Sequence, residues 1–173
     1  VCAAAIKIAR HVTGNDLVFC WGYHGFQDWY ISSTDRNAGI PQAVRDLTKT
    51  FDYNDLDGLR AMFEEHKGKV AAVMMEPVIA EKPLCFGPND CSNPDCSKKC
   101  QNTFLHEVKK IAHENDALLI FDEMISGFRF AMGGVGEYLG VDPDLATFGK
   151  GITNGMPLGV LVGKSEYMKE FDK

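Results

Sequence analysis

The sequence predicts an α/β protein with a mostly parallel sheet that is covered by helices on both faces. Short continuous apolar runs, which are typical of strands buried in a parallel sheet, alternate along the chain with amphipathic stretches at helical spacing. This alternation indicates βαβ units. The chain has 173 residues, of which 45% are hydrophobic, so it is long enough to bury the substantial core of one domain.

The first elements follow from local signals. The chain opens within an apparent helix that should stop near Gly14, a plausible C-cap. Residues 17–20 form a continuous apolar run that predicts a buried strand, and residues 22–38 are expected to form a polar loop. A further strand is expected at residues 48–51.

The remaining elements repeat the same alternation. Asp55 can cap a helix that runs to about residue 66, with apolar side chains at helical spacing. The other expected elements are a strand at 70–75, a helix at 103–115 and strands at 117–121, 145–148 and 158–162. The last two strands flank a glycine-rich turn.

Composition excludes several classes of function. The net charge is −6 and no basic run is longer than the pair at residues 98–99, so we predict no nucleic-acid partner. No apolar stretch is long enough to cross a membrane, and no signal peptide is visible. We therefore predict a cytoplasmic protein with no membrane partner.

The most informative feature is a carboxylate followed by a lysine. Asp122 ends the apolar run of residues 118–121, and Lys150 lies in the glycine-rich stretch of residues 147–159. Pyridoxal phosphate (PLP) chemistry needs this pair, because a lysine amine forms a Schiff base with the cofactor aldehyde and an aspartate keeps the pyridine nitrogen protonated. Taken alone, the lysine is more often part of a solvated turn, and a helix cap or a structural ion-pair partner is the less favoured alternative for the aspartate.

Four sequence blocks in order carry a resemblance to a known family. They are WGYHG at 21–25, MEPV at 75–78, DEMISGFR at 122–129 and the lysine block. In this order they resemble class III aminotransferases of the aspartate aminotransferase superfamily, with glutamate-1-semialdehyde aminomutase and its relatives as the nearest subgroup. Shorter matches at 53–55, 133–138 and 143–145 fit that subgroup. The resemblance covers the chain except residues 84–101.

The resemblance implies a fold and an activity. The fold is the large domain of the aspartate aminotransferase type (PLP fold type I), with residues 1–173 as its central part and a cysteine-rich insertion at about 84–101. The activity is PLP-dependent transfer of an amino group between an amine or amino acid and a carbonyl acceptor. An intramolecular aminomutase reaction is the alternative. The full-length enzyme is expected to be a homodimer.

The resemblance also assigns roles to site residues. Lys150 is the catalytic residue, which holds the cofactor as a Schiff base and then moves a proton. Asp122 binds the pyridine nitrogen. Tyr23 stacks on the cofactor ring with His24 beside it, and Met124 packs on the other ring face. A packed loop aromatic and a core methionine are the structural alternatives for Tyr23 and Met124.

Other expectations concern neighbouring and missing parts. Glu76, Glu123 and Arg129 are expected to act through structure, the last two in ion pairs that fix Asp122 and the lysine turn. Residues 1–9 resemble the body of the helix that binds the cofactor phosphate. The phosphate cradle would then precede residue 1, so the chain is expected to be a fragment that is inactive alone.

Four cysteines form the main departure from the family pattern. The four are Cys85, Cys91, Cys96 and Cys100, and His106 lies nearby in the sequence. The spacing suits a structural zinc knuckle, and thiols without metal are an equal alternative, whereas disulfides are less favoured in a cytoplasmic protein. We assign no metal ligand. A zinc-stabilised interaction module is the rival function, and a dehydrogenase domain is disfavoured because no G-x-G-x-x-G follows the first strand.

Overall fold

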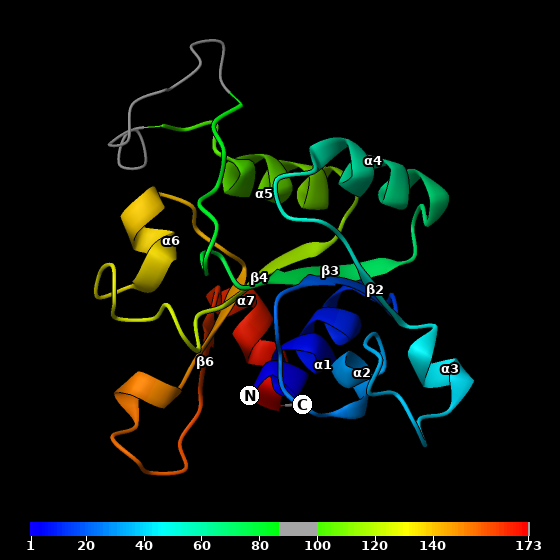
Figure 1. Ribbon diagram of the computed structural model, residues 1–173, viewed down its shortest axis with the longest axis horizontal. Coiled ribbons are helices and arrows are strands. Elements are labelled where there is room, and N and C mark those ends of the chain that lie inside the picture. The colour runs from blue at the N-terminus through cyan, green and yellow to red at the C-terminus, as the bar shows by residue number, and fades with distance from the viewer. Residues whose placement is uncertain (87–99, 173) are drawn as a thin grey trace.

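The computed structural model describes residues 1–86 and 100–172 (Figure 1). The predicted roles of Cys91 and Cys96 lie outside the described residues. The elements in chain order are α1 (Cys2–Thr13), β1 (Leu17–Trp21), α2 (Asp28–Ile31), α3 (Gln42–Arg45), β2 (Thr48–Thr50), α4 (Leu56–Glu65), β3 (Val70–Met75), α5 (Phe104–Glu114), β4 (Leu118–Asp122), α6 (Gly134–Leu139), β5 (Leu145–Phe148), η2 (Lys150–Ile152), β6 (Val160–Gly163), α7 (Ser165–Met168) and η3 (Lys169–Asp172).

The described strands form one six-stranded sheet in the order β2-β1-β3-β4-β5-β6. Strands β1 to β5 pair in parallel, which confirms the predicted mostly parallel sheet. Strand β6 instead pairs antiparallel with β5. The physical reason is the connection between them, because the short turn through η2 contains no crossover helix and a parallel return needs one.

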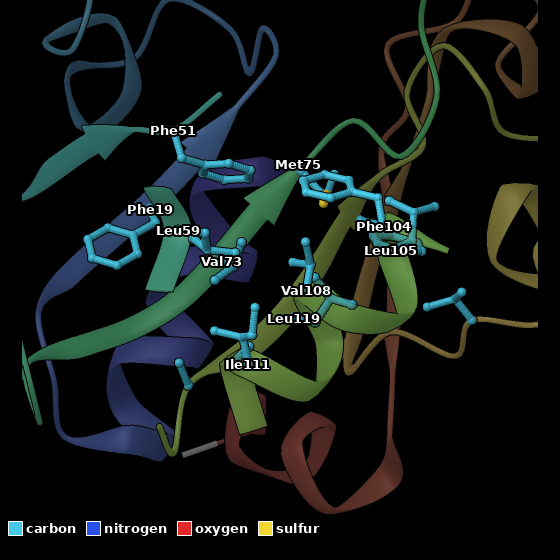
Figure 2. Close-up of a cluster of buried hydrophobic side chains, with 14 of the residues drawn as sticks. Phe19, Phe51, Leu59, Val73, Met75, Phe104, Leu105, Val108, Ile111 and Leu119 are labelled. Carbon is cyan, nitrogen blue, oxygen red and sulfur yellow. The ribbon is translucent and has the colours of Figure 1, made fainter. Parts of the chain in front are cut away.

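Helices cover both faces of the sheet, as predicted (Figure 1). One buried cluster joins the sheet to α4 and α5, and it contains the side chains labelled in Figure 2, including Phe19, Phe104 and Leu119. A second cluster joins the other face to α1 through Ile6 and Ile8. Every residue of β3 and β4 is buried, which explains why these strands appear in the sequence as continuous apolar runs.

Local signals in the sequence set several element boundaries. Gly14 follows α1 with φ 69°, and its N–H donates to the carbonyl of Arg10. This left-handed position is nearly free of cost only for glycine, so α1 ends there. Asp55 caps α4 as predicted, since its side chain accepts a hydrogen bond from the Gly58 N–H at 2.9 Å.

Short helices were not predicted. Helix α2 lies within the expected polar loop, and α3, α6 and α7 also lack a counterpart among the expected elements. Each has only four to six residues, which is too short to display a helical repeat of apolar positions. Among residues 1–86 and 100–172, no helix combines the length and apolar character needed to cross a bilayer.

A buried carboxylate ties the amino ends of β4 and β5 to neighbouring elements. The fully buried Asp144 accepts hydrogen bonds from Lys164 Nζ at 2.6 Å, from His113 Nε2 at 2.7 Å and from the Leu119 N–H at 2.8 Å. Burial alone would raise the pKa of the Asp144 carboxyl, but these donors outweigh it and hold that pKa below its ordinary value. The ionised form of Asp144 therefore stabilises the fold.

We expect Asp144→Asn to lower the free energy of unfolding by about 2 to 3 kcal/mol at neutral pH, because two charged or ring N–H donors lose an anionic acceptor. Asp142→Asn, at an exposed position two residues away, is the matched control. Because the folded pKa of Asp144 is lowered, its contribution is present above about pH 4 and is lost as the pH falls through that lowered pKa. Denaturant unfolding at several pH values should show the gap between wild type and Asp144→Asn close on acidification. An unchanged gap would contradict this account.

Candidate active site

The candidate site lies at the carboxyl ends of the parallel strands. The sheet order reverses at the β1/β3 boundary, since the chain leaves β1 for β2 on one side and β3 starts on the other. Ligands of open α/β sheets bind at such switch points. A cavity of about 240 Å³ opens there, lined by Val1, Cys2, Ala3, Tyr23, His24, Gly25, Phe26, Gln27, Trp29, Asp122, Met124 and Lys150. The structure thus brings together all five predicted site residues.

A larger cavity of about 760 Å³ lies beside α6 and β6. Its walls are mostly apolar and include Phe128, Met132 and Val162. None of the five predicted site residues lines it. We place the chemistry in the smaller cavity because all five predicted site residues, including the buried Asp122, line it.

Asp122 is the central group of the site. It is the last residue of β4, its side chain is 1% exposed, and a carboxylate so buried needs partners. Its Oδ1 accepts from the Met124 N–H at 3.0 Å and from Thr147 Oγ1 at 3.3 Å. Its Oδ2 lies 2.7 Å from His24 Nδ1 and 3.5 Å from the Cys2 thiol. The carboxylate is thus fixed from β5, from α1 and from the loop after β1.

The hydrogen-bond partners of His24 indicate which of its ring nitrogens carry a hydrogen. His24 Nε2 lies 3.1 Å from the Trp21 carbonyl oxygen, which can only accept, so Nε2 carries a hydrogen. His24 Nδ1 faces Asp122 Oδ2 at 2.7 Å, and one further proton is needed to make that contact a hydrogen bond. The buried pair therefore holds this proton between the ring and the carboxylate. The ring is further packed against Trp29, at a centroid distance of 5.9 Å and an interplanar angle of 19°.

The donor set around Asp122 leaves room for a ring N–H donor. Three of its contacts come from N–H or O–H groups or from a ring nitrogen, but the fourth is the weak S–H donor of Cys2. Burial, together with the charge of Asp122, raises the pKa of the Cys2 thiol to about 12, so it remains protonated. A protonated pyridine nitrogen entering from the cavity would be a stronger donor to Oδ2 than this thiol.

Lys150 approaches from the turn after β5. It begins η2 with φ 46°, a left-handed conformation that is uncommon for a residue with a side chain. Such positions cluster at functional sites, where the surrounding structure maintains them. Gly149 before it is packed closely, because a Cβ atom there would lie 2.4 Å from the Met124 methyl carbon. This contact fixes the lysine turn against Met124.

Tyr23 and Met124 have different surroundings. The Tyr23 side chain is 53% exposed, and its ring meets Tyr30 edge to face at 5.6 Å. One ring face of Tyr23 is thus available to a flat ligand. Met124 is half-buried, packs against the cluster that contains α1, and lines the same cavity.

Glu76 supports the aromatic loop. It is 3% exposed, and its Oε2 accepts from the Tyr23 N–H at 3.2 Å. Burial raises the pKa of the Glu76 carboxyl, while the Tyr23 N–H and the nearby charges of His24 and Lys150 oppose that rise. A Cβ atom on Gly22 would lie 2.7 Å from Glu76 Oε2. The predicted structural role of Glu76 thus has a concrete form, which is to hold the loop that carries Tyr23 and His24.

Within residues 1–86 and 100–172, neither Glu123 nor Arg129 forms the ion pair expected of it. The Glu123 carboxylate accepts from Ser126 Oγ at 2.5 Å and from the N–H groups of Val135 and Gly136 at 2.6 and 3.2 Å. Arg129 Nε donates instead to the Ile125 carbonyl. The reason is that backbone N–H groups at the start of α6 already donate to the Glu123 carboxylate. Burial raises the pKa of this carboxyl group.

Sequence reasoning missed several groups that build the site. Neither Cys2 nor Thr147 was assigned a site role from the sequence. Trp29 and Tyr30 lie in the unpredicted α2, where the Tyr30 hydroxyl donates to the Gly22 carbonyl at 2.7 Å. No signal in the sequence marks Cys2 as a partner of Asp122, because 120 residues separate them.

The predicted zinc cluster is only partly described. Cys85 and Cys100 lie together, with their sulfur atoms 2.8 Å apart, whereas His106 Nδ1 pairs with Thr103 Oγ1 at 2.8 Å. Across residues 1–86 and 100–172, no three potential metal ligands gather. The zinc-stabilised module stays a prediction, since Cys91 and Cys96 lie outside those residues.

Nearly the whole chain is similar to known proteins. A family model described as Aminotransferase class-III matches residues 2–173. A glutamate-1-semialdehyde 2,1-aminomutase of Methanococcus maripaludis is 37% identical over 96% of this chain and 39% of its own length. A 3-aminobutyryl-CoA aminotransferase of Cloacimonas acidaminovorans is 38% identical over 95% of this chain and 36% of its own length. The chain therefore spans about two fifths of these curated relatives.

A solved structure extends the likeness to the fold. The PLP internal aldimine form of a protein of Sphingopyxis sp. MTA144 aligns with a TM-score of 0.76 at 30% identity. The alignment covers 96% of this chain and 37% of that one. The similarity to this structure therefore extends over nearly all of this chain.

We expect Gly22→Ala to destabilise the protein by about 1 to 3 kcal/mol more than Gly25→Ala, because the new Cβ overlaps the Glu76 carboxylate. Gly25→Ala is the matched control, since both glycines have φ near 100° but no atom lies within 4 Å of a Cβ at Gly25. Adding Glu76→Ala to Gly22→Ala should remove the excess, as measured by denaturant unfolding in a double-mutant cycle. Additive effects of the two changes would show that Glu76 does not support the loop.

Proposed function

This chain belongs to the class III aminotransferase family, and we propose that the protein of which it is a part is a PLP-dependent transaminase. The resemblance predicted from the four sequence blocks is confirmed by the family model over residues 2–173. The predicted PLP fold type I is confirmed as well. The proposed reaction moves an amino group between a small amine or amino acid and a carbonyl acceptor.

The observation that carries the proposal is the convergence of Asp122 and Lys150 on one cavity, from the ends of the adjacent strands β4 and β5. PLP, when bound, supplies an electron-withdrawing ring that stabilises negative charge on the substrate carbon. Asp122 Oδ2 would accept from the ring nitrogen, and the His24 contact would keep the carboxylate oriented. Tyr23 and Met124 would contact the ring faces.

Lys150 would act at its Nζ atom. The amine would bind the cofactor covalently and, when displaced by the substrate amine, would take up and return the transferred proton. Its neighbour Glu76 is buried and its charge interacts with that of Lys150. The left-handed backbone at Lys150 would aim the side chain from the turn into the cavity.

An intramolecular aminomutase is the second candidate. It is favoured by the Methanococcus maripaludis relative, an aminomutase that is 37% identical to this chain. Both reactions use the same lysine and aspartate, so they differ in whether the product leaves before the amino group returns. Product analysis with a 1,2-amino-carbonyl substrate would separate them, because only the mutase converts it without a second substrate.

The proposal includes an organisation for the whole protein. Residues 1–173 form the central part of the PLP-binding large domain, with a cysteine-rich insertion at about 84–101. The protein is a cytoplasmic homodimer. Support for dimerisation comes from large apolar side chains on the described surface, since Phe26, Met132 and Met156 are 80%, 79% and 70% exposed.

Borohydride reduction of the full-length protein with bound PLP, followed by peptide mapping, should place the pyridoxyl group on Lys150. We expect Lys150→Ala to lower kcat about 1,000-fold or more, because the covalent and proton-transfer roles are lost together. Lys110→Ala, at an exposed lysine of α5 that does not line the cavity, is the control and should keep both the label and the activity. A pyridoxyl group on Lys164, or on no lysine, would refute the assignment.

We expect Asp122→Asn to fold normally and to lower kcat by about 100-fold or more, because a neutral amide cannot hold the ring nitrogen protonated. Circular dichroism should match that of the wild type, so that lost activity is not lost structure. If a well-folded Asp122→Asn variant turned over like the wild type, Asp122 would be structural only.

A further inference from the structure

We propose that Cys85 and Cys100 are a redox-responsive dithiol that closes into a reversible intramolecular disulfide. The two sulfur atoms lie 2.8 Å apart, although the residues are separated by 15 positions in the sequence. The pair lies within the cysteine-rich stretch at about residues 84–101. The inference goes beyond the proposed transaminase and does not depend on PLP.

The main chain holds Cys85 beside the segment that directly follows Cys100. Cys85 and Thr103 form an antiparallel bridge, flanked by hydrogen bonds from the Phe86 N–H to the Asn102 carbonyl and from the Phe104 N–H to the Leu84 carbonyl, both at 2.8 Å. The Leu84 N–H also donates to Asn54 Oδ1 at 2.9 Å. Because the backbone fixes both sides, the thiols have a high effective concentration for each other.

The sulfur separation favours a disulfide over a shared zinc ion. A disulfide bond is about 2.05 Å long, so the sulfurs need to close by only about 0.8 Å. Two thiolates on one tetrahedral zinc lie about 3.8 Å apart, since each Zn–S bond is about 2.3 Å. The 2.8 Å separation is thus about 0.8 Å longer than a disulfide bond and about 1.0 Å shorter than the separation on a shared zinc ion.

The surroundings make this pair the reactive one among the described cysteines. Cys85 and Cys100 are half-buried, whereas Cys2 and Cys20 are buried at 8% and 0% exposure. Burial raises the pKa of the Cys20 thiol to about 12 and removes it from oxidation chemistry. Burial and the contact with Cys85 also raise the pKa of Cys100, so closure should speed up as the pH rises, because the thiolate is the attacking form.

The oxidant we name is a low-molecular-weight disulfide such as oxidised glutathione. One cysteine thiolate attacks a glutathione sulfur, forms a mixed disulfide and releases one glutathione thiolate. The second cysteine thiolate then attacks the protein sulfur of that mixed disulfide and releases the other glutathione thiolate. The two protons lost by the cysteines pass to the two glutathiones, and two electrons pass from the protein to glutathione.

The crosslink would fasten the connection between β3 and α5. On the β3 side, Pro77 follows Glu76 and its carbonyl accepts from the buried Tyr53 hydroxyl at 2.7 Å. On the α5 side, Phe104 packs against Tyr53 at 4.8 Å and against Phe86 at 6.4 Å. A covalent bond between Cys85 and Cys100 closes the chain between these anchors, so it should stabilise the folded state.

The test equilibrates the full-length protein in glutathione buffers of increasing oxidised-to-reduced ratio, alkylates the remaining thiols and maps the peptides. We expect a loss of two hydrogen masses and one crosslinked peptide pair that joins Cys85 to Cys100. The crosslink should persist in the double variant Cys91→Ser/Cys96→Ser and vanish in Cys85→Ser and in Cys100→Ser. Oxidation should raise Tm by a few degrees in the wild type, but not in Cys85→Ser.

Three results would overturn the proposal. One is a pair that stays reduced in fully oxidised glutathione, and another is a crosslink that runs mainly through Cys91 or Cys96. The third is one zinc per chain in the reduced protein that is lost in both Cys85→Ser and Cys100→Ser, which would make the pair a metal site. Because none of these readouts uses PLP, a failed proposal here leaves the proposed transaminase untouched, and the reverse also holds.

Discussion

The site depends on the need to partner one buried carboxylate. Asp122 ends the central strand β4 with its side chain 1% exposed, and an ionised carboxyl group at that depth is costly without donors. The loop after β1, the strand β5 and the start of α1 each supply a donor or a shared proton, through His24, Thr147 and Cys2. The hydrogen-bond partners of the Asp122 carboxylate therefore come from segments near both ends of the chain.

The same constraint shapes the surroundings of Asp122. His24 reaches Asp122 only because its loop is held from two sides, by Glu76 through the Tyr23 N–H and by the Tyr30 hydroxyl through the Gly22 carbonyl. The close approach of Gly22 to Glu76 leaves no room for a Cβ atom. The lysine turn is fixed in a similar way, by the contact between Gly149 and Met124. Lys150 and Asp122 are thus positioned by packing at the ends of β5 and β4.

Much of this could be predicted from the sequence, because strands buried on both faces leave continuous apolar runs, and the carboxyl ends of those runs locate Asp122 and the lysine turn. The antiparallel β6 was not predicted, since a strand's own residues do not encode its direction. The Cys2 contact was missed because it joins positions 120 residues apart. The ion pairs expected of Glu123 and Arg129 do not form within the described residues, because backbone N–H groups at α6 satisfy Glu123 first. Polar contacts between residues far apart in the chain leave no periodic pattern in the sequence from which they could be predicted.

The central claim is that His24 and Asp122 share one proton while His24 Nε2 stays protonated toward the Trp21 carbonyl. Nitrogen-15 NMR of histidine-labelled protein, with His24 assigned through His24→Gln, measures both ring nitrogens directly. The account predicts a protonated Nε2 in wild type, and an Nδ1 signal that shifts toward the unprotonated value in Asp122→Ala, where the shared proton has lost its acceptor. An unprotonated Nε2 in wild type, or an Nδ1 signal that ignores the loss of Asp122, would contradict it.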